Sequence, residues 1–156
     1  MAAVSLGFAF VSVLVTVSVT DLDRRVIPNA ILAAGAVVGL AIIAPTDPGS
    51  LPGRAIAALA AGGFLLLGTL RDRDGMGMGD VKLAALMGLY LGIAVAPALL
   101  VAFAAGGLAG IGLMLRHGAP ARKRAVPFGP FLALGGIVGL LAGNELVAWY
   151  VDSFLA

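Results

Sequence analysis

The stretch GMGMGDVKLAALMGLYLG, residues 75–92, sets one carboxylate, Asp80, between a glycine-rich segment and a long apolar run. The surrounding chain is equally apolar: 61% of its 156 residues are hydrophobic, only 12% are charged, and the mean hydropathy is +1.09. Soluble domains carry about 25% charged residues, so this chain cannot build a surface that water wets. The sequence therefore predicts an all-α polytopic membrane protein, with residues 1–156 forming a single transmembrane domain.

Six apolar stretches are separated by short polar or turn-forming segments. A helix needs about 20 residues to cross the hydrocarbon core, so about six transmembrane helices are expected. The fourth stretch is short, and either it begins inside the membrane or the protein thins the bilayer locally. The first stretch lacks a basic leader and a cleavage site, which indicates a retained helix and not a signal peptide. The stretches cover residues 2–20, 29–45, 53–70, 80–93, 95–115 and 129–150.

Lysine and arginine are divided very unevenly between the connections. Nine of the ten lie in or beside the connections after the first, third and fifth stretches, and only Arg54 lies on the opposite side. Cytoplasmic loops carry the excess of basic residues, so both chain ends are predicted to lie outside. Trp149 and Tyr150 then fall at the outer interface, where amphipathic aromatic side chains settle. The nine are Arg24, Arg25, Arg71, Arg73, Lys82, Arg116, Arg122, Lys123 and Arg124.

Composition also excludes several kinds of site. The chain has no cysteine, which removes disulfides, thiolate metal sites and a cysteine nucleophile. His117 is the only histidine and cannot build a metal site alone. The glycine run fits neither a calcium loop, since the later acidic ligands are missing, nor a dinucleotide motif, since no strand precedes it. We therefore expect no metal, no other cofactor and no nucleic-acid partner.

Glycine is abundant, at 23 residues. Three pairs have the small-xxx-small spacing that allows close helix contact: Gly88 and Gly92, Gly106 and Gly110, and Gly135 and Gly139. We interpret these pairs as packing positions.

Two acidic residues occupy matching places in the predicted topology. Asp21 ends the first apolar stretch and Asp80 begins the fourth, so both lie at the cytoplasmic boundary and can meet if the two helices pack together. Asp23 is about 200° further round the helix and is expected to face elsewhere, beside Arg24 or Arg25. Asp72 and Asp74 alternate with arginines, which is typical of a solvated loop.

A close pair of carboxylates supports hydrolytic chemistry. Two such groups cannot both ionise easily, so they hold one proton between them. The charged member can activate water while the neutral member protonates a carbonyl or a leaving amine, as in aspartic proteases. Gly75, Gly77 and Gly79 would keep the approach to Asp80 free of Cβ atoms and permit positive φ, which gives a substrate strand room.

Simpler interpretations stay open for each acid taken alone. Asp80 opens a helix and is a natural N-cap. Asp21 is equally consistent with an ordinary interfacial acid.

Three segments together resemble the type IV prepilin peptidase family, the glycine-x-glycine-aspartate aspartic proteases of membranes. The first is DLDRRVIPN (21–29), with an Asp seven residues before Pro-Asn. The second is GMGDVKL (77–83), followed by glycines at 88 and 92. The third is VPFGPFLALGG (126–136), which opens the last apolar stretch. Their order and spacing match the family over nearly the whole chain.

The resemblance implies a role for each matching residue. Asp21 and Asp80 would be the catalytic pair, and Gly77 and Gly79 would shape the cleft. Pro28 and Asn29 would begin the second helix, although an ordinary helix-entry turn explains both equally well. Lys82 matches the family motif with its role left open, since its amine can reach headgroups or favour ionised acids nearby. The PFGPF segment (127–131) would help frame the site or simply begin a helix.

The family's activity is the removal of short basic leaders from type IV pilin-like precursors at the cytoplasmic face. The resemblance thus implies a multi-pass protein of the inner (cytoplasmic) membrane, whose partners are such a precursor and the lipid bilayer. Longer relatives also methylate the new N-terminus, using an extra N-terminal region that often has paired cysteines. The sequence predicts a short peptidase form and gives no support for methyl transfer.

Two other classes of function are also consistent with buried acids in a membrane protein. A small proton-coupled transporter or channel would use them as a relay. Against it, the acids gather at one face, and no inverted repeat is visible. A non-catalytic envelope scaffold would carry the same acids at the interface, and neutralising both would then leave its phenotype intact.

Overall fold

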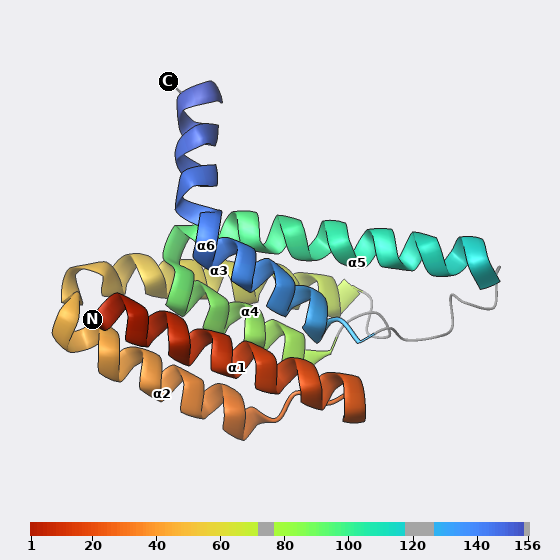
Figure 1. Ribbon diagram of the computed structural model, residues 1–156, viewed down its shortest axis with the longest axis horizontal. Helices are drawn as coiled ribbons and strands as arrows, with labels where there is room; N and C mark the ends of the chain where they lie inside the picture. Colours follow the sequence, from red (N-terminus) through yellow and green to blue (C-terminus); the bar gives the residue numbers. More distant parts are fainter. Residues whose placement is uncertain (72–76, 118–126, 155–156) are drawn as a thin grey trace.

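The computed structural model describes residues 1–71, 77–117 and 127–154, and these residues form six α-helices and two short 3₁₀ turns (Figure 1). Each of the six apolar stretches is a helix, with ends within a few residues of those expected. In chain order the elements are α1 (Ala2–Arg24), α2 (Asn29–Thr46), η1 (Pro48–Ser50), α3 (Leu51–Arg71), α4 (Met78–Leu91), η2 (Gly92–Ala94), α5 (Val95–His117) and α6 (Gly129–Phe154).

Five helical segments in the described residues are long and apolar enough to cross a membrane, which makes the chain a polytopic membrane protein. They are α1, α2, η1 with α3, the run Met78–Arg116, and α6. Within that run, α4 has only 14 residues, so it makes a crossing only if it begins inside the membrane or the bilayer is thinned locally. Figure 1 shows that the chain reverses direction between α4 and α5, at η2. Gly92 makes this reversal with a φ of 59°, which glycine adopts without strain.

Helix α4 lies at the centre of the bundle. It packs against α2, α3, α5 and α6, and eight of its residues are buried. A helix that is apolar on every side is suited to such a position. Leu83 and Met87 of α4 are fully buried, together with Phe10 and Leu14 of α1 and Leu132 of α6. The hydrophobic core therefore surrounds α4, the helix whose first turn contains Asp80.

Two polar side chains fix the C-terminal half of α4. The Tyr90 ring stacks on Phe10 with centroids 4.9 Å apart, and its hydroxyl donates a hydrogen bond to the Gly35 carbonyl of α2 at 2.6 Å. Arg54 of α3 donates from Nη1 to the carbonyl oxygens of Leu89 and Tyr90, at 3.1 and 2.6 Å. Arg54, the one cation that the charge count placed outside, thus caps the carbonyls that end α4.

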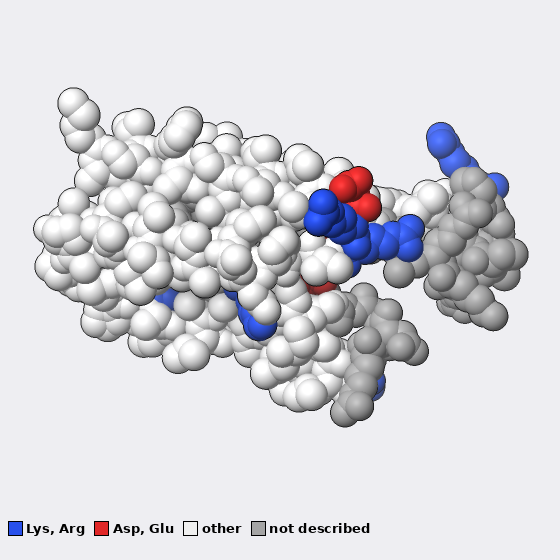
Figure 2. All heavy atoms as spheres, turned by 90° about the horizontal axis from the view of Figure 1, so that it is seen from below, with Lys and Arg blue, Asp and Glu red and all other residues white. Residues whose placement is uncertain are grey.

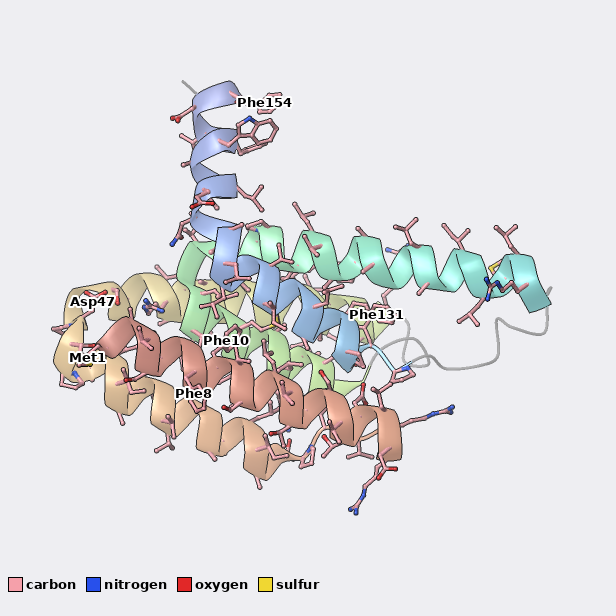
Figure 3. All side chains as sticks on the ribbon, in the orientation of Figure 1. Met1, Phe8, Phe10, Asp47, Phe131 and Phe154 are labelled. Carbon is pink, nitrogen blue, oxygen red and sulfur yellow. The ribbon has the colours of Figure 1, made fainter. Side chains whose placement is uncertain are left out.

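The outer surface is mainly apolar, as lipid contact requires. In the face drawn in Figure 2 most atoms are white, and the larger groups of charged side chains lie toward one end. Figure 3 shows Met1 and Asp47 at one end of the bundle and Phe131, near the start of α6, toward the other. Helix α6 bends, and its C-terminal part projects from the bundle (Figure 1). Its buried residues all precede this projection, lying between Gly129 and Gly143.

Candidate active site

Asp21 lies in the last turn of α1 and is buried, with 6% of its surface exposed. Its Oδ2 accepts a hydrogen bond of 2.9 Å from the backbone N–H of Gly129, the first residue of α6. First-turn N–H groups have no partner within their own helix and carry partial positive charge. The first residue of α6 therefore binds the Asp21 carboxylate in the last turn of α1.

Asp80 is the third residue of α4 and is 8% exposed. Its Oδ2 accepts a hydrogen bond of 3.1 Å from the backbone N–H of Gly77. The expectation that Asp80 is itself the N-cap was wrong: Gly77 occupies the cap, and Asp80 reaches back to it from the third position. The other oxygen, Oδ1, is buried and has no hydrogen-bond partner among the described residues.

The two acids are brought to one region of the bundle. Helix α6 packs against both α1 and α4, and Ile27, just after α1, fills the space beside Gly79, the neighbour of Asp80. Both carboxyl groups are buried, and each accepts one backbone N–H at the start of a helix. Such an arrangement can hold one shared proton and perform general acid and base chemistry.

The motif glycines act only partly as the sequence suggested, because the described ones lack positive φ. Gly77 is extended, with a φ of −84°, and among the described glycines only Gly92 has a positive φ. A Cβ on Gly79 would stand 2.8 Å from Cβ of Ile27, which is in the connection between α1 and α2. The space next to Gly79 is therefore filled by Ile27, which lets the first turn of α4 approach that connection. Gly75 lies outside the described residues.

The other residues of the two motifs meet across α2 and α4. Pro28 is the N-cap of α2 and Asn29 its first residue, so both begin the second helix as expected. Lys82 Nζ donates a hydrogen bond of 2.8 Å to Oδ1 of Asn29, and both side chains are exposed. This bond joins the first motif to the second and gives Lys82 a partner that the sequence did not identify.

Of the remaining acids at this face, Asp23 is the one that the described residues include. Asp23 is exposed and lies 3.7 Å from Arg24, in agreement with its predicted position facing elsewhere. Asp72 and Asp74 fall outside the described residues. Among the described residues, no three histidine, cysteine, aspartate or glutamate side chains group together to hold a metal ion.

The resemblance suggested that the PFGPF segment would frame the site or begin a helix, but sequence reasoning did not identify Gly129 as the residue that contacts Asp21. A Cβ at this position would stand 2.6 Å from Oδ2 of Asp21, so only glycine leaves room for the carboxylate. The available signal was the PFGPF segment, where a glycine precedes the proline of a helix's first turn. That signal indicates a helix start, but it does not say which side chain the start contacts.

Fold and site together define a polytopic membrane protein with two buried aspartates at the ends of different helices. The model of the type IV leader peptidase family matches residues 8–115, a span that includes both aspartates. The chain belongs to this family.

Similar proteins share most of this chain. It is 35% identical to the prepilin leader peptidase/N-methyltransferase of Aeromonas hydrophila, over 92% of this chain and 51% of that protein. It is 34% identical to the protein of the same name from Bacillus subtilis strain 168, over 94% of this chain and 59% of that protein. The chain thus spans about half the length of the curated relatives it matches. No solved structure matches it.

Proposed function

We propose that this chain is a membrane-embedded aspartic endopeptidase that removes the basic leader of type IV pilin-like precursors. Asp21 and Asp80 are the catalytic pair. The site is shaped by Gly77, Gly79, Pro28 and Asn29. Beside it, Lys82 connects α4 to α2 through its hydrogen bond to Asn29. Family membership and the names of the relatives support the reaction class.

The observation that carries the proposal is the burial of two aspartates, one in the last turn of α1 and one in the first turn of α4, in an otherwise apolar bundle. Buried acids in membrane proteins are expensive, so they mark function more often than structure. Here both belong to the two segments that match the family motifs. The pair supplies the two groups that peptide hydrolysis needs, a base for water and an acid for the carbonyl oxygen.

The reaction consumes one water molecule. One aspartate takes a proton from water while the water oxygen bonds to the scissile carbonyl carbon, and the other aspartate protonates the carbonyl oxygen. The first aspartate then gives its proton to the nitrogen, the second recovers a proton from a hydroxyl of the diol, and the C–N bond breaks. The products are a carboxylic acid and an amine, and the pair regains its single proton.

The proposed placement puts this chemistry at the cytoplasmic face of the inner membrane. The excess of basic residues on one side supports six crossings with both chain ends outside. In this topology α4 makes the fourth crossing as a short helix, with the end of α1 and the start of α4 at the cytoplasmic boundary. A precursor's basic leader would stay in the cytoplasm while its apolar stem lies among the helices.

Co-expression with a type IV pilin precursor tests the function. The mass of the precursor's N-terminus is measured with and without this chain in a host lacking its own leader peptidase. We expect a shortened N-terminus only when the chain is present. An unprocessed N-terminus with several precursors, together with proton leak in vesicles, would refute the peptidase and favour a proton-coupled transporter.

A further inference from the structure

We propose that the two aspartates have unequal roles: Asp21 is the anionic base, Asp80 holds the shared proton, and Gly129 positions Asp21. This inference rests on the proposed function and deepens it. It is carried by one difference between the two carboxyl groups: each accepts a backbone N–H from a helix start, but only Asp80 has a buried oxygen without a hydrogen-bond partner among the described residues.

Asp21 is bound as an acceptor. Its Oδ2 receives the Gly129 N–H at 2.9 Å, at the positive end of the α6 dipole. A hydrogen bond to an ionised acceptor is roughly twice as strong as one to a neutral acceptor. The Gly129 N–H is therefore the kind of partner that a carboxylate acting as a base uses. This acceptor contact comes from a helix 108 residues away in the sequence, so its geometry depends on the packing of α6 against α1.

One carboxyl oxygen of Asp80 is buried and has no hydrogen-bond donor near it among the described residues. Oδ2 accepts the Gly77 N–H, while Oδ1 is buried without a partner among the described residues. A buried anionic oxygen without a donor is costly, whereas a protonated one can donate toward a neighbouring anion or a substrate carbonyl. Oδ1 of Asp80 is therefore the oxygen that carries the shared proton.

These positions give the hydrolysis a direction. Asp21 takes the proton from water, and Oδ1 of Asp80 gives its proton to the scissile carbonyl oxygen. Asp21 then protonates the leaving nitrogen, and Asp80 takes a proton back from the diol as the C–N bond breaks. Each aspartate ends in the state in which it began, so the assignment is consistent over a full turnover.

Asparagine variants test this assignment without any substrate. Asparagine has the shape of a neutral aspartic acid and cannot replace an anion. In purified protein we expect Asp21→Asn to lower the apparent Tm by about 3 °C and Asp80→Asn to change it by less than about 1 °C. Any result in which Asp21→Asn is not the more destabilising variant overturns the assignment. Failure of the proposed function is a separate outcome, because it shows only as absent cleavage.

The positioning role of Gly129 is tested by Gly129→Ala with Gly136→Ala as the matched control. Both glycines are in α6 and face α1, but a Cβ on Gly136 would meet the flexible end of Leu14, 2.9 Å away, and no carboxylate. We expect Gly129→Ala to lower kcat by about 10- to 100-fold with KM unchanged, and Gly136→Ala to keep wild-type kcat. Wild-type kcat in Gly129→Ala, or an equal loss in both variants, refutes the role.

Discussion

Replacement of either Asp21 or Asp80 by asparagine is expected to reduce leader cleavage by about 10³-fold or more. Asparagine keeps the size of the side chain but can neither accept a proton from water nor give one to a carbonyl. Each variant therefore removes one of the two proton-transfer groups on which the reaction depends. The rate is measured from the mass of the precursor's N-terminus over time, with membrane levels of each variant compared by immunoblot.

Asp23→Asn is the matched control for this loss. Asp23 is two residues from Asp21 on the same helix, yet it is exposed beside Arg24. Its substitution is expected to leave cleavage at the wild-type rate, because surface ion pairs contribute little. Full cleavage by Asp21→Asn or by Asp80→Asn would contradict the proposed chemistry.

Gly88→Ala is expected to destabilise the fold strongly. Gly88 of α4 faces α3, and a Cβ there would stand 2.5 Å from both N and Cα of Ala58. These are backbone atoms, so α3 and α4 must separate to admit the methyl group. Overpacking of this kind costs about 3 kcal/mol, which corresponds to a fall of about 10 °C in apparent Tm.

Gly107→Ala controls for the change of glycine to alanine itself. Gly107 lies within α5, and nothing stands within 4 Å of a Cβ at that position. This variant is expected to melt within about 2 °C of the wild type, since alanine favours the helix slightly. An unchanged Tm for Gly88→Ala in a detergent thermal scan would show that α3 and α4 do not pack as described.

The helices could be predicted from the sequence because apolar length alone defines a membrane helix. The spacing of glycines was a weaker guide to packing. Gly135 and Gly139 both lie against α5, so this pair acts as expected. Gly92 is different, because it forms the turn after α4 and not a helix contact. The same spacing thus served two purposes, and only the fold separates them.

The site could be predicted only for residues at the ends of apolar stretches that the topology places on the same face of the membrane. Asp21 and Asp80 were identified because each lies at the end of an apolar stretch on the same predicted face. The contact between Gly129 and Asp21 was not, because local sequence does not say how α6 is rotated against α1. For the same reason, the sequence did not reveal that Ile27 fills the space beside Gly79.

The central claim is that Asp21 and Asp80 lie close together in the membrane, and the absence of cysteine allows it to be tested directly. The double variant Asp21→Cys with Asp80→Cys is treated in membranes with a short thiol cross-linker and then cut between the two positions. We expect the two fragments to stay joined, while those of the control pair Asp23→Cys with Asp80→Cys separate. Separation of the fragments from the first pair, in protein shown to be folded and labelled at both cysteines, would contradict the account.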